Sequence, residues 1–414
     1  MTDDESLLRA ILENRDDDTP RLIYADRLEA QGDPRGAFIR LQCASAQKEM
    51  ALVDPRYWDL HLRGFTLGVK GPRVHETVCP VIPVRPNSII PRREIELGRA
   101  YVVKWLEQFG VGDASLAPYF SLTFFRGFAA GLRVSPEAIK LKGLHSEIAK
   151  VFAIPTLERL EAFLVSDGAG RELADMMQWG QFRALHICGP GPVNWYHDPT
   201  SLPIDQTIRQ MASAPGARAL TYLKMSRCWI GLEAFEMLVN SPNLDNLRVL
   251  ALEGFMHQWD AAGGLPDYYR VIGRQHLQVL LDSRVAGWLT SLSLQDHNFS
   301  EEVELLASAS RLTNLRCLDL CGNKVKPWQE QALRERWGQD LFLLSDKSKE
   351  NEGFMKTFAQ RYQYSHFYEY DFDCVRRKRD RNSMGWRDDG MPTCRSEGVG
   401  SAQPRIYAND AQPT

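Results

Sequence analysis

A spaced leucine pattern in the second half of the chain restricts its fold more than any other feature. Near residue 320 the sequence reads L-R-C-L-D-L-C-G-N, in which Leu315, Leu318 and Leu320 are followed by Asn323. Weaker copies place the second leucine of the pattern at positions 160, 185, 223, 250 and 292. Together with position 318, these leucines lie 25, 38, 27, 42 and 26 residues apart. Three of these spacings match a repeat made of one strand and one helix, which takes about 20–29 residues.

One such repeat cannot bury its leucines alone, so neighbouring repeats must stack. The sequence therefore predicts an α/β fold, a curved leucine-rich-repeat solenoid with parallel strands inside and helices outside, over residues 119–344. Segments 233–239 and 301–309 favour helices between the strands, and a helix from Pro327 to Trp337 ends the array. Asn323, and Cys228 at the equivalent position, should hydrogen-bond the backbone of their turns.

The first fifty residues predict a small helical domain, with three short helices in place of a repeat. Apolar spacing favours a helix over 4–14, and Thr19-Pro20 begins a second helix. Gly32 ends that helix in a left-handed conformation, and Asp33-Pro34 begins the third. A domain of this size buries little apolar surface, so we expect it to pack against its neighbour.

Two runs in this domain, D-T-P-R-L-I-Y-A-D-R-L-E from Asp18 and G-D-P-R-G-A-F-I-R-L-Q from Gly32, resemble the bacterial repeat-companion domain. The chain departs from the usual residues of that family at Arg27, where Trp is common, and at Ala37, where Glu is common. The resemblance implies that residues 1–50 form a companion domain beside leucine-rich repeats in a bacterial protein. It implies an interaction module and no defined activity.

Two of the spacings between repeats are too long, and the extra residues fall at 189–203 and 255–274. Both insertions begin just after a strand, so in a parallel array they leave by the same rim, where insertions often form the binding face. Their aromatic and imidazole side chains suit the centre of a protein interface. The candidate partner-binding residues are Trp195, Tyr196, His197, Trp259, Tyr268 and Tyr269. Alternatively, the two loops fold over their own repeats and bury these side chains as local core.

Two further segments flank the repeats. Residues 51–118 predict a proline-rich connector with one amphipathic helix, and residues 345–414 predict an aromatic cap followed by a disordered tail. The tail contains a basic run that is a candidate polyanion-binding site, made of Arg376, Arg377, Lys378, Arg379 and Arg381. Neighbouring aspartates nearly neutralise this run, which favours a solvated charge cluster instead.

Composition excludes several other classes of protein. The 414 residues include 50 Lys and Arg against 53 Asp and Glu, a net charge of −3 that gives no global attraction for nucleic acid. Eight cysteines without a C-x-x-C pair indicate reduced thiols and no disulfide framework. The acidic start does not resemble a secretory signal, and no run of 18 apolar residues occurs. These features predict a soluble, cytoplasmic protein without a membrane partner.

No enzyme motif stands out in the chain. The sequence contains no G-x-x-x-x-G-K-S/T, G-x-S-x-G, H-E-x-x-H or kinase signature, and Cys43, His61, His75 and Cys79 fit no zinc spacing. We therefore predict no catalytic residues, no metal and no cofactor. The favoured function is recognition of a macromolecule, with a protein favoured as the partner, through the concave face and the aromatic rim. Binding of nucleic acid or another polyanion by the basic run is the alternative, and an unrecognised enzyme is the least favoured.

Overall fold

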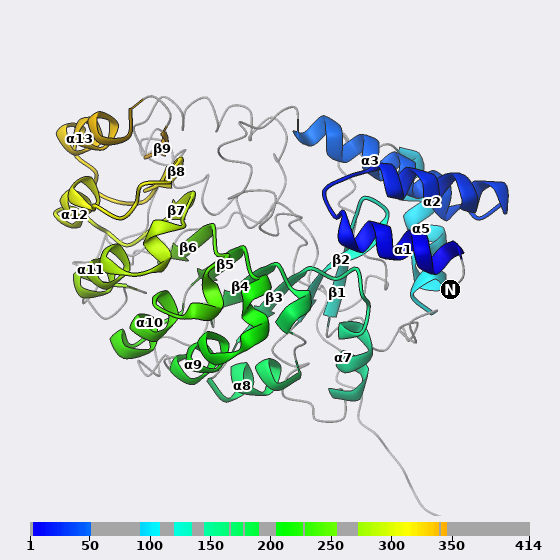
Figure 1. Cartoon of the computed structure of the whole chain (residues 1–414), viewed down its shortest axis with the longest axis horizontal. Coiled ribbons are helices and arrows are strands. Elements are labelled where there is room, and N and C mark those ends of the chain that lie inside the picture. Colours follow the sequence, from blue (N-terminus) through cyan, green and yellow to red (C-terminus); the bar gives the residue numbers. More distant parts are fainter. Residues whose placement is uncertain are drawn as a thin grey trace, which may run out of the picture. The chain divides into compact units, whose positions relative to one another are not determined.

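A mostly parallel sheet forms the centre of the computed structural model (Figure 1). Among the described residues it has nine strands in the order β1 to β9, so that each strand lies beside its neighbours in the sequence. The first pair, β1 and β2, is antiparallel, and every later pair is parallel. The strands are β1 Phe120–Phe125, β2 Phe128–Val134, β3 Arg159–Phe163, β4 Ala184–Cys188, β5 Tyr222–Ser226, β6 Val249–Glu253, β7 Ser291–Ser293, β8 Cys317–Asp319 and β9 Phe342–Leu344.

The structure describes residues 3–50, 92–107, 120–134, 145–164, 167–176, 179–189, 204–226, 228–254, 272–338 and 341–345. All of these belong to one unit of the chain, Met1–Glu369. Within these ranges, no helix has the length and apolar character needed to cross a lipid bilayer.

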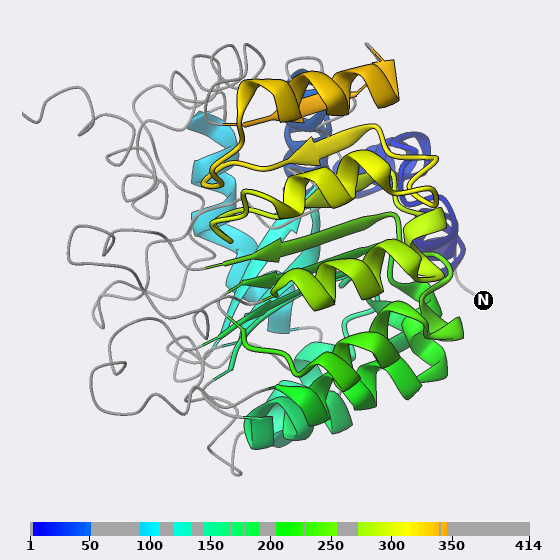
Figure 2. The same ribbon diagram turned by 90° about the vertical axis from the view of Figure 1, so that its left-hand side faces the viewer.

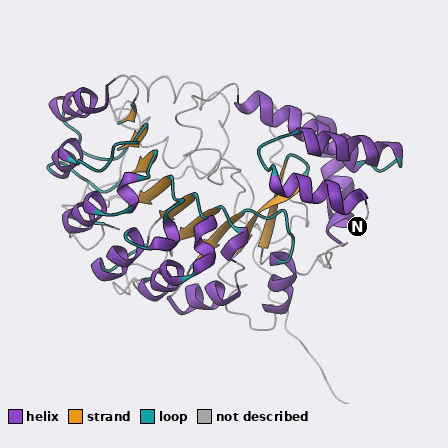
Figure 3. Cartoon of the chain, in the orientation of Figure 1, coloured by secondary structure: helices purple, strands orange, loops and turns teal. Residues whose placement is uncertain are grey.

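One helix follows each of the strands β3 to β8, and these helices cover the same face of the sheet (Figures 2 and 3). They are α8 Asp167–Met176, α9 Asp205–Ser213, α10 Leu232–Val239, α11 Arg274–Asp282, α12 Glu302–Ser308 and α13 Pro327–Trp337. Before several strands the chain makes a short 3-10 turn, in η3 Trp179–Gln181, η5 Pro215–Ala219, η6 Pro242–Leu244 and η9 Val285–Gly287. This mixed α/β arrangement is compatible with the α/β solenoid that the repeats predict.

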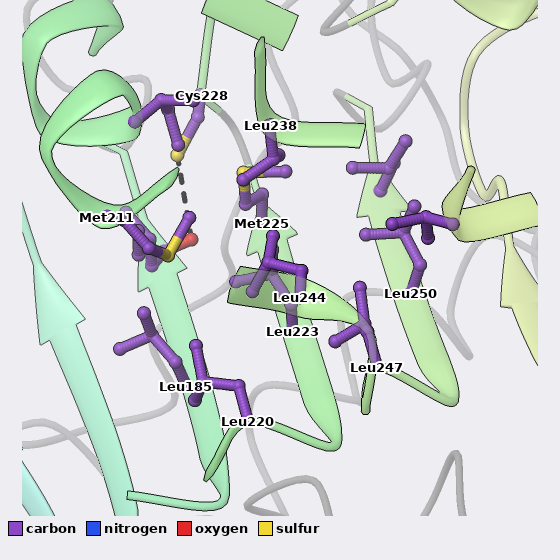
Figure 4. Close-up of a cluster of buried hydrophobic side chains, with 14 of the residues drawn as sticks. Leu185, Met211, Leu220, Leu223, Met225, Cys228, Leu238, Leu244, Leu247 and Leu250 are labelled. Carbon is purple, nitrogen blue, oxygen red and sulfur yellow. Dashed lines mark hydrogen bonds between the residues drawn. The ribbon is translucent and has the colours of Figure 1, made fainter. Parts of the chain in front are cut away.

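The leucines of the repeat align in one row between the sheet and the helices. The strand register pairs the six predicted leucines in sequence, and each is at most 1% exposed. Figure 4 shows Leu185, Leu223 and Leu250 side by side on neighbouring strands. Leu132 of β2 and Leu343 of β9 extend the row at its two ends. The positions of β3 to β8 were therefore predicted. Strand β1, before the repeats, and β9, beyond the helix that was expected to end the array, were not.

Polar side chains at the turns bond the repeats to one another. The Asn323 amide donates to the Leu294 carbonyl at 2.6 Å and accepts from the Phe299 backbone N–H at 2.9 Å. Cys228 Sγ donates to the Ile187 carbonyl at 3.5 Å, so both predicted turn bonds are confirmed (Figure 4). His297 makes an equivalent bond, from its Nε2 to the Leu252 carbonyl at 2.9 Å. Each of the three residues thus provides a hydrogen-bond donor to a carbonyl at the end of the neighbouring strand.

The N-terminal helices are α1 Asp3–Glu13, α2 Thr19–Ala30 and α3 Arg35–Met50, close to the predicted bounds. Gly32 has the expected left-handed backbone, with φ of 73°. Helix α3 contacts the β1–β2 turn, where the Gly127 N–H donates to Gln42 Oε1 at 2.6 Å. A Cβ at Gly127 would lie 2.3 Å from Ile39, so only glycine permits this approach.

Two further helices lie outside the repeat pattern, α5 Arg92–Glu107 and α7 His145–Phe152. Helix α5 matches the amphipathic helix that the connector predicts. It buries Leu97 and Trp105, and the Trp105 ring lies 5.1 Å from that of Phe38 on α3.

We expect Asn323→Ala to lower the free energy of unfolding by about 2–3 kcal/mol, because the buried Leu294 carbonyl and the buried Phe299 N–H lose their partner. Asn314→Ala is the matched control. Its amide bonds the Gly287 carbonyl at an exposed position, where water can replace it, and we expect less than about 1 kcal/mol there. Urea unfolding followed by circular dichroism measures both values, and equal costs would contradict the role of Asn323.

Candidate functional site

Side chains between the core leucines point to the other face of the sheet, because successive residues of a strand alternate between its two faces. We call this side, opposite helices α8 to α13, the polar face. The strand register places Arg133, Glu161, His186 and Lys224 side by side on β2, β3, β4 and β5. The same row continues through Ala251 and Ser293 to Asp319 on β8.

A continuous series of polar contacts crosses five strands of this face. Arg133 pairs with Glu161, whose other carboxylate oxygen lies 3.1 Å from His186 Nδ1. His186 Nε2 lies 2.9 Å from Ser226 Oγ, which is 2.9 Å from Glu253 Oε2. Glu253 in turn pairs with Lys224 Nζ at 2.5 Å. We call these six residues the polar chain: Arg133, Glu161, His186, Ser226, Glu253 and Lys224.

The centre of the polar chain is more deeply buried than its ends. The Glu161 and His186 side chains are 7% and 11% exposed, whereas those of Arg133, Lys224 and Glu253 are 20–23% exposed. Burial alone would raise the pKa of Glu161, but the hydrogen bond from His186 and the charge of Arg133 lower it to about 2. Glu161 is therefore ionised at neutral pH.

In His186 and Glu253 of the polar chain, too, burial disfavours the charged form. Burial lowers the pKa of His186, and the Glu161 carboxylate raises it by a smaller amount. The net downward shift favours the neutral imidazole. Burial would raise the pKa of Glu253, but the Lys224 ammonium outweighs it and the net shift is downward. The polar chain thus holds two ionised carboxylates, each beside its own cation.

Glu161, His186 and Ser226 have the connectivity of an acid–histidine–serine triad, in which histidine accepts the serine proton and an oxyanion is stabilised by hydrogen-bond donors. The Ser226 hydroxyl has one proton for two neighbours, His186 and Glu253. A Glu253 carboxylate 2.9 Å from Oγ opposes negative charge at the attacking oxygen. The geometry therefore favours a hydrogen-bond relay over a nucleophile.

Asp319 forms a second polar cluster on this face. Its carboxylate accepts from the Cys321 N–H at 3.0 Å and from the Gln295 side chain. Asp319 is 1% exposed, and burial raises its pKa to about 6 although both hydrogen bonds oppose the shift. Gln295 cannot neutralise a carboxylate as Arg133 or Lys224 can, which explains why Asp319 and Glu161 shift in opposite directions.

An apolar stripe runs beside the polar chain on the same face. It consists of Ala184, Tyr222, Val249, Ala251, Cys317 and Phe342, with Cys321 packed against it. Burial raises the pKa of Tyr222 to about 12, so its hydroxyl stays protonated. The polar face thus combines fixed charges with buried apolar side chains, each at most 6% exposed.

The aromatic candidates for partner binding, Trp195, Tyr196, His197, Trp259, Tyr268 and Tyr269, lie outside the described residues. So does the basic run of Arg376, Arg377, Lys378, Arg379 and Arg381. The structure does show where the two aromatic segments begin. Gly189 follows β4 and donates to the Ser226 carbonyl at 2.8 Å, and Gly254 follows β6 and donates to the Gln295 carbonyl at 2.8 Å. Both segments start at the same edge of the sheet, with β5 between the two strands that they follow.

The polar chain was not predicted from the sequence. Its signal was present, because the residue after the second leucine of the early repeats is Glu161, His186 or Lys224. Aligning the repeats by their leucines would have placed these residues in one row, but only the register shows that they bond. Among the described residues, no group of three or more His, Cys, Asp or Glu side chains has an arrangement that could hold a metal ion.

Comparisons with known proteins add no assignment. No protein-family model matches the chain, and no curated protein matches it either.

We expect Glu161→Gln to lower the free energy of unfolding by about 2–3 kcal/mol at pH 7, because Arg133 loses its counter-charge in a half-buried site. The folded-state pKa of Glu161 is depressed from 4.5 to about 2, so its stabilisation is present above pH 4.5 and is lost as pH falls toward 2. Urea titrations from pH 7 to pH 2.5 should therefore show the variant and the wild type converging. Glu233→Gln, at an exposed pair with Arg209, is the control and should change nothing measurable.

We expect the opposite pH dependence for Asp319→Asn. The folded-state pKa of Asp319 is raised from 3.8 to about 6, so its contribution is fully present below pH 3.8 and is lost as pH rises through 6. Relative to wild type, the variant should gain about 2 kcal/mol of stability between pH 4 and pH 7.5. Asn323→Ala is the control: it removes no titrating group, so it should lower the free energy of unfolding equally at pH 4 and pH 7.5. An Asp319→Asn effect that does not change with pH would contradict the pKa assignment.

Proposed function

We propose that this chain is a non-catalytic recognition protein of the bacterial cytoplasm, a leucine-rich-repeat solenoid with an N-terminal repeat-companion domain. Its partner is a protein, which binds the polar face and a rim formed by the aromatic segments after β4 and β6. The resemblance of residues 18–42 to the companion domain and the register of the leucine rows support the architecture.

The polar chain is the observation that carries the proposal. Burying charged groups costs free energy, and apolar side chains on the same strands would stabilise the sheet at least as well. The polar chain nevertheless fixes charges of both signs at defined positions on β2, β3, β5 and β6. Such a preorganised pattern favours one partner by complementary charge and disfavours others by repulsion.

The aromatic segments supply the other half of the proposed interface. Both begin at the edge where β4 and β6 end, directly beside Ser226 and Glu253 of the polar chain. Trp and Tyr contribute large contact areas with few rotatable bonds, and they dominate the binding energy of many protein interfaces. A partner seated on the polar face would therefore meet these side chains at its border.

Affinity capture from a lysate of the cells that make this protein tests the proposal. We compare the wild type with a variant combining Trp195→Ala, Tyr196→Ala, Trp259→Ala and Tyr268→Ala, with circular dichroism as the check on folding. We expect a protein that the wild type retains and the variant loses, with at least about a tenfold drop in recovery.

Trp328→Ala is the matched control, because Trp328 is 52% exposed at the start of α13 on the helix-covered side of the sheet. It should retain the partner. If the combined variant also retains it, the rim is not the binding face. If salt-sensitive nucleic acid is recovered in place of protein, the alternative of a polyanion binder replaces the proposal.

A further inference from the structure

A second surface lies at the opposite edge of the sheet, where the parallel strands begin. We call it the start edge. One residue directly before each strand joins a backbone ladder along this edge: the Arg183 N–H donates to the Glu158 carbonyl at 2.7 Å, and the Arg248 N–H to the Thr221 carbonyl at 2.9 Å. The ladder continues to the Arg316 N–H, which donates to the Thr290 carbonyl at 2.8 Å. Arginines therefore precede β4, β6 and β8, on every second strand.

Neighbouring turns add more positive charge and one large aromatic ring. Arg218 of η5 is exposed, and Asn246 bonds its carbonyl at 2.8 Å, which fixes Arg218 beside the turn that precedes β6. Trp288 is 43% exposed, and the Arg248 guanidinium lies over its ring at 5.9 Å. We call Arg218, Arg248, Trp288 and Arg316 the basic–aromatic patch.

The carboxylates of the described start edge are already neutralised by other arginines. Asp245 pairs with Arg284 at 2.7 Å, and Glu158 pairs with Arg15 at 3.5 Å. Within the described part of the chain, neither Arg218 nor Arg316 makes a side-chain ion pair, and both are exposed. The patch therefore presents positive charge that no described acidic side chain compensates.

At the starts of β2 and β4, the start edge contacts an acidic turn of the same polypeptide. The turn between α1 and α2 carries Asp16, Asp17 and Asp18. Asp18 pairs with Arg126 at 3.3 Å in the turn that leads into β2, and Asp16 lies 3.9 Å from Arg183 before β4. Arg126 is 5% exposed and also donates to the Asp16 carbonyl at 2.9 Å. An acidic stretch of polypeptide thus occupies the start edge from β2 to β4.

We propose that the basic–aromatic patch, the continuation of this edge over β5 to β8, binds an acidic segment of a protein partner. Alternate strands lie about 10 Å apart, which is the span of about three residues of extended chain, so carboxylates at such intervals reach successive arginines. Arginine forks bind carboxylates through paired hydrogen bonds, and Trp288 offers an apolar surface to the segment between them. A polypeptide is favoured over nucleic acid because the acidic turn of Asp16 and Asp18 already contacts the other end of the same edge.

This surface lies at the opposite edge from the aromatic segments, so its test is independent of the proposed function. The probe is a fluorescein-labelled peptide of ten glutamates, titrated with the full-length chain and followed by fluorescence anisotropy at about 50 mM and about 200 mM salt. We expect saturable binding that weakens with salt. Arg218→Glu combined with Arg316→Glu should weaken it at least about tenfold.

Arg171→Glu combined with Arg274→Glu is the matched control, because it changes the net charge equally at exposed positions on α8 and α11. It should bind the peptide like the wild type. Trp288→Ala changes no charge, and we expect it to weaken binding about threefold while leaving the salt dependence unchanged. Circular dichroism of each variant confirms folding.

Three outcomes would overturn the proposal. The first is an Arg218/Arg316 variant that binds the peptide as tightly as the control variant does. The second is peptide binding that is lost only when the basic residues among 376–381 are replaced by neutral ones. That result would assign peptide binding to the basic run. The third is a ten-nucleotide oligothymidylate bound at least about tenfold more tightly than the peptide, which makes nucleic acid the ligand of this edge.

Discussion

The leucine row between the sheet and the helices is the constraint on which the rest of the structure depends. Each leucine is buried only because the adjacent repeat supplies the next strand and helix, so no repeat buries its core by itself. Burial of each side chain contributes about 1.5–3 kcal/mol. A shift by one residue would turn the whole row to the other face, and that penalty fixes the register along all the parallel strands.

The same register creates both surfaces to which we assign binding. Because the leucines fix which residues face the helices, the residues between them are left for the polar face, where Glu161, His186 and Lys224 become neighbours. The backbone ladder before the strands likewise aligns the arginines of the start edge. Substitutions at these positions leave the leucine row intact, so the surfaces can change while the fold persists. Recognition by charge pattern is therefore compatible with a core built from one repeated residue type.

Buried charge distinguishes the polar face from an ordinary sheet surface. Glu161 stays ionised because Arg133 and His186 approach it, whereas Asp319 receives hydrogen bonds from a backbone N–H and an amide, and its pKa rises to about 6. Burial raises the pKa of both carboxylates, and in Glu161 the hydrogen bond from His186 and the charge of Arg133 outweigh it. The polar chain therefore depends on the opposite charges that neighbouring strands bring together.

The sequence by itself determined the positions of β3 to β8, the helices α10, α12 and α13, and the turn roles of Asn323 and Cys228, because these follow from local spacing and from burial of a repeated residue. It did not predict β1 or β9, since the segments around Leu122 and Leu343 lack the full repeat pattern. The candidate aromatic residues also came from sequence, as insertions between repeats. Only the tertiary structure decided that six residues from five strands form one polar chain and that Asp16 meets Arg183. Those contacts join residues tens to more than a hundred positions apart, and their distances are set by the register of the strands, which a single sequence does not state.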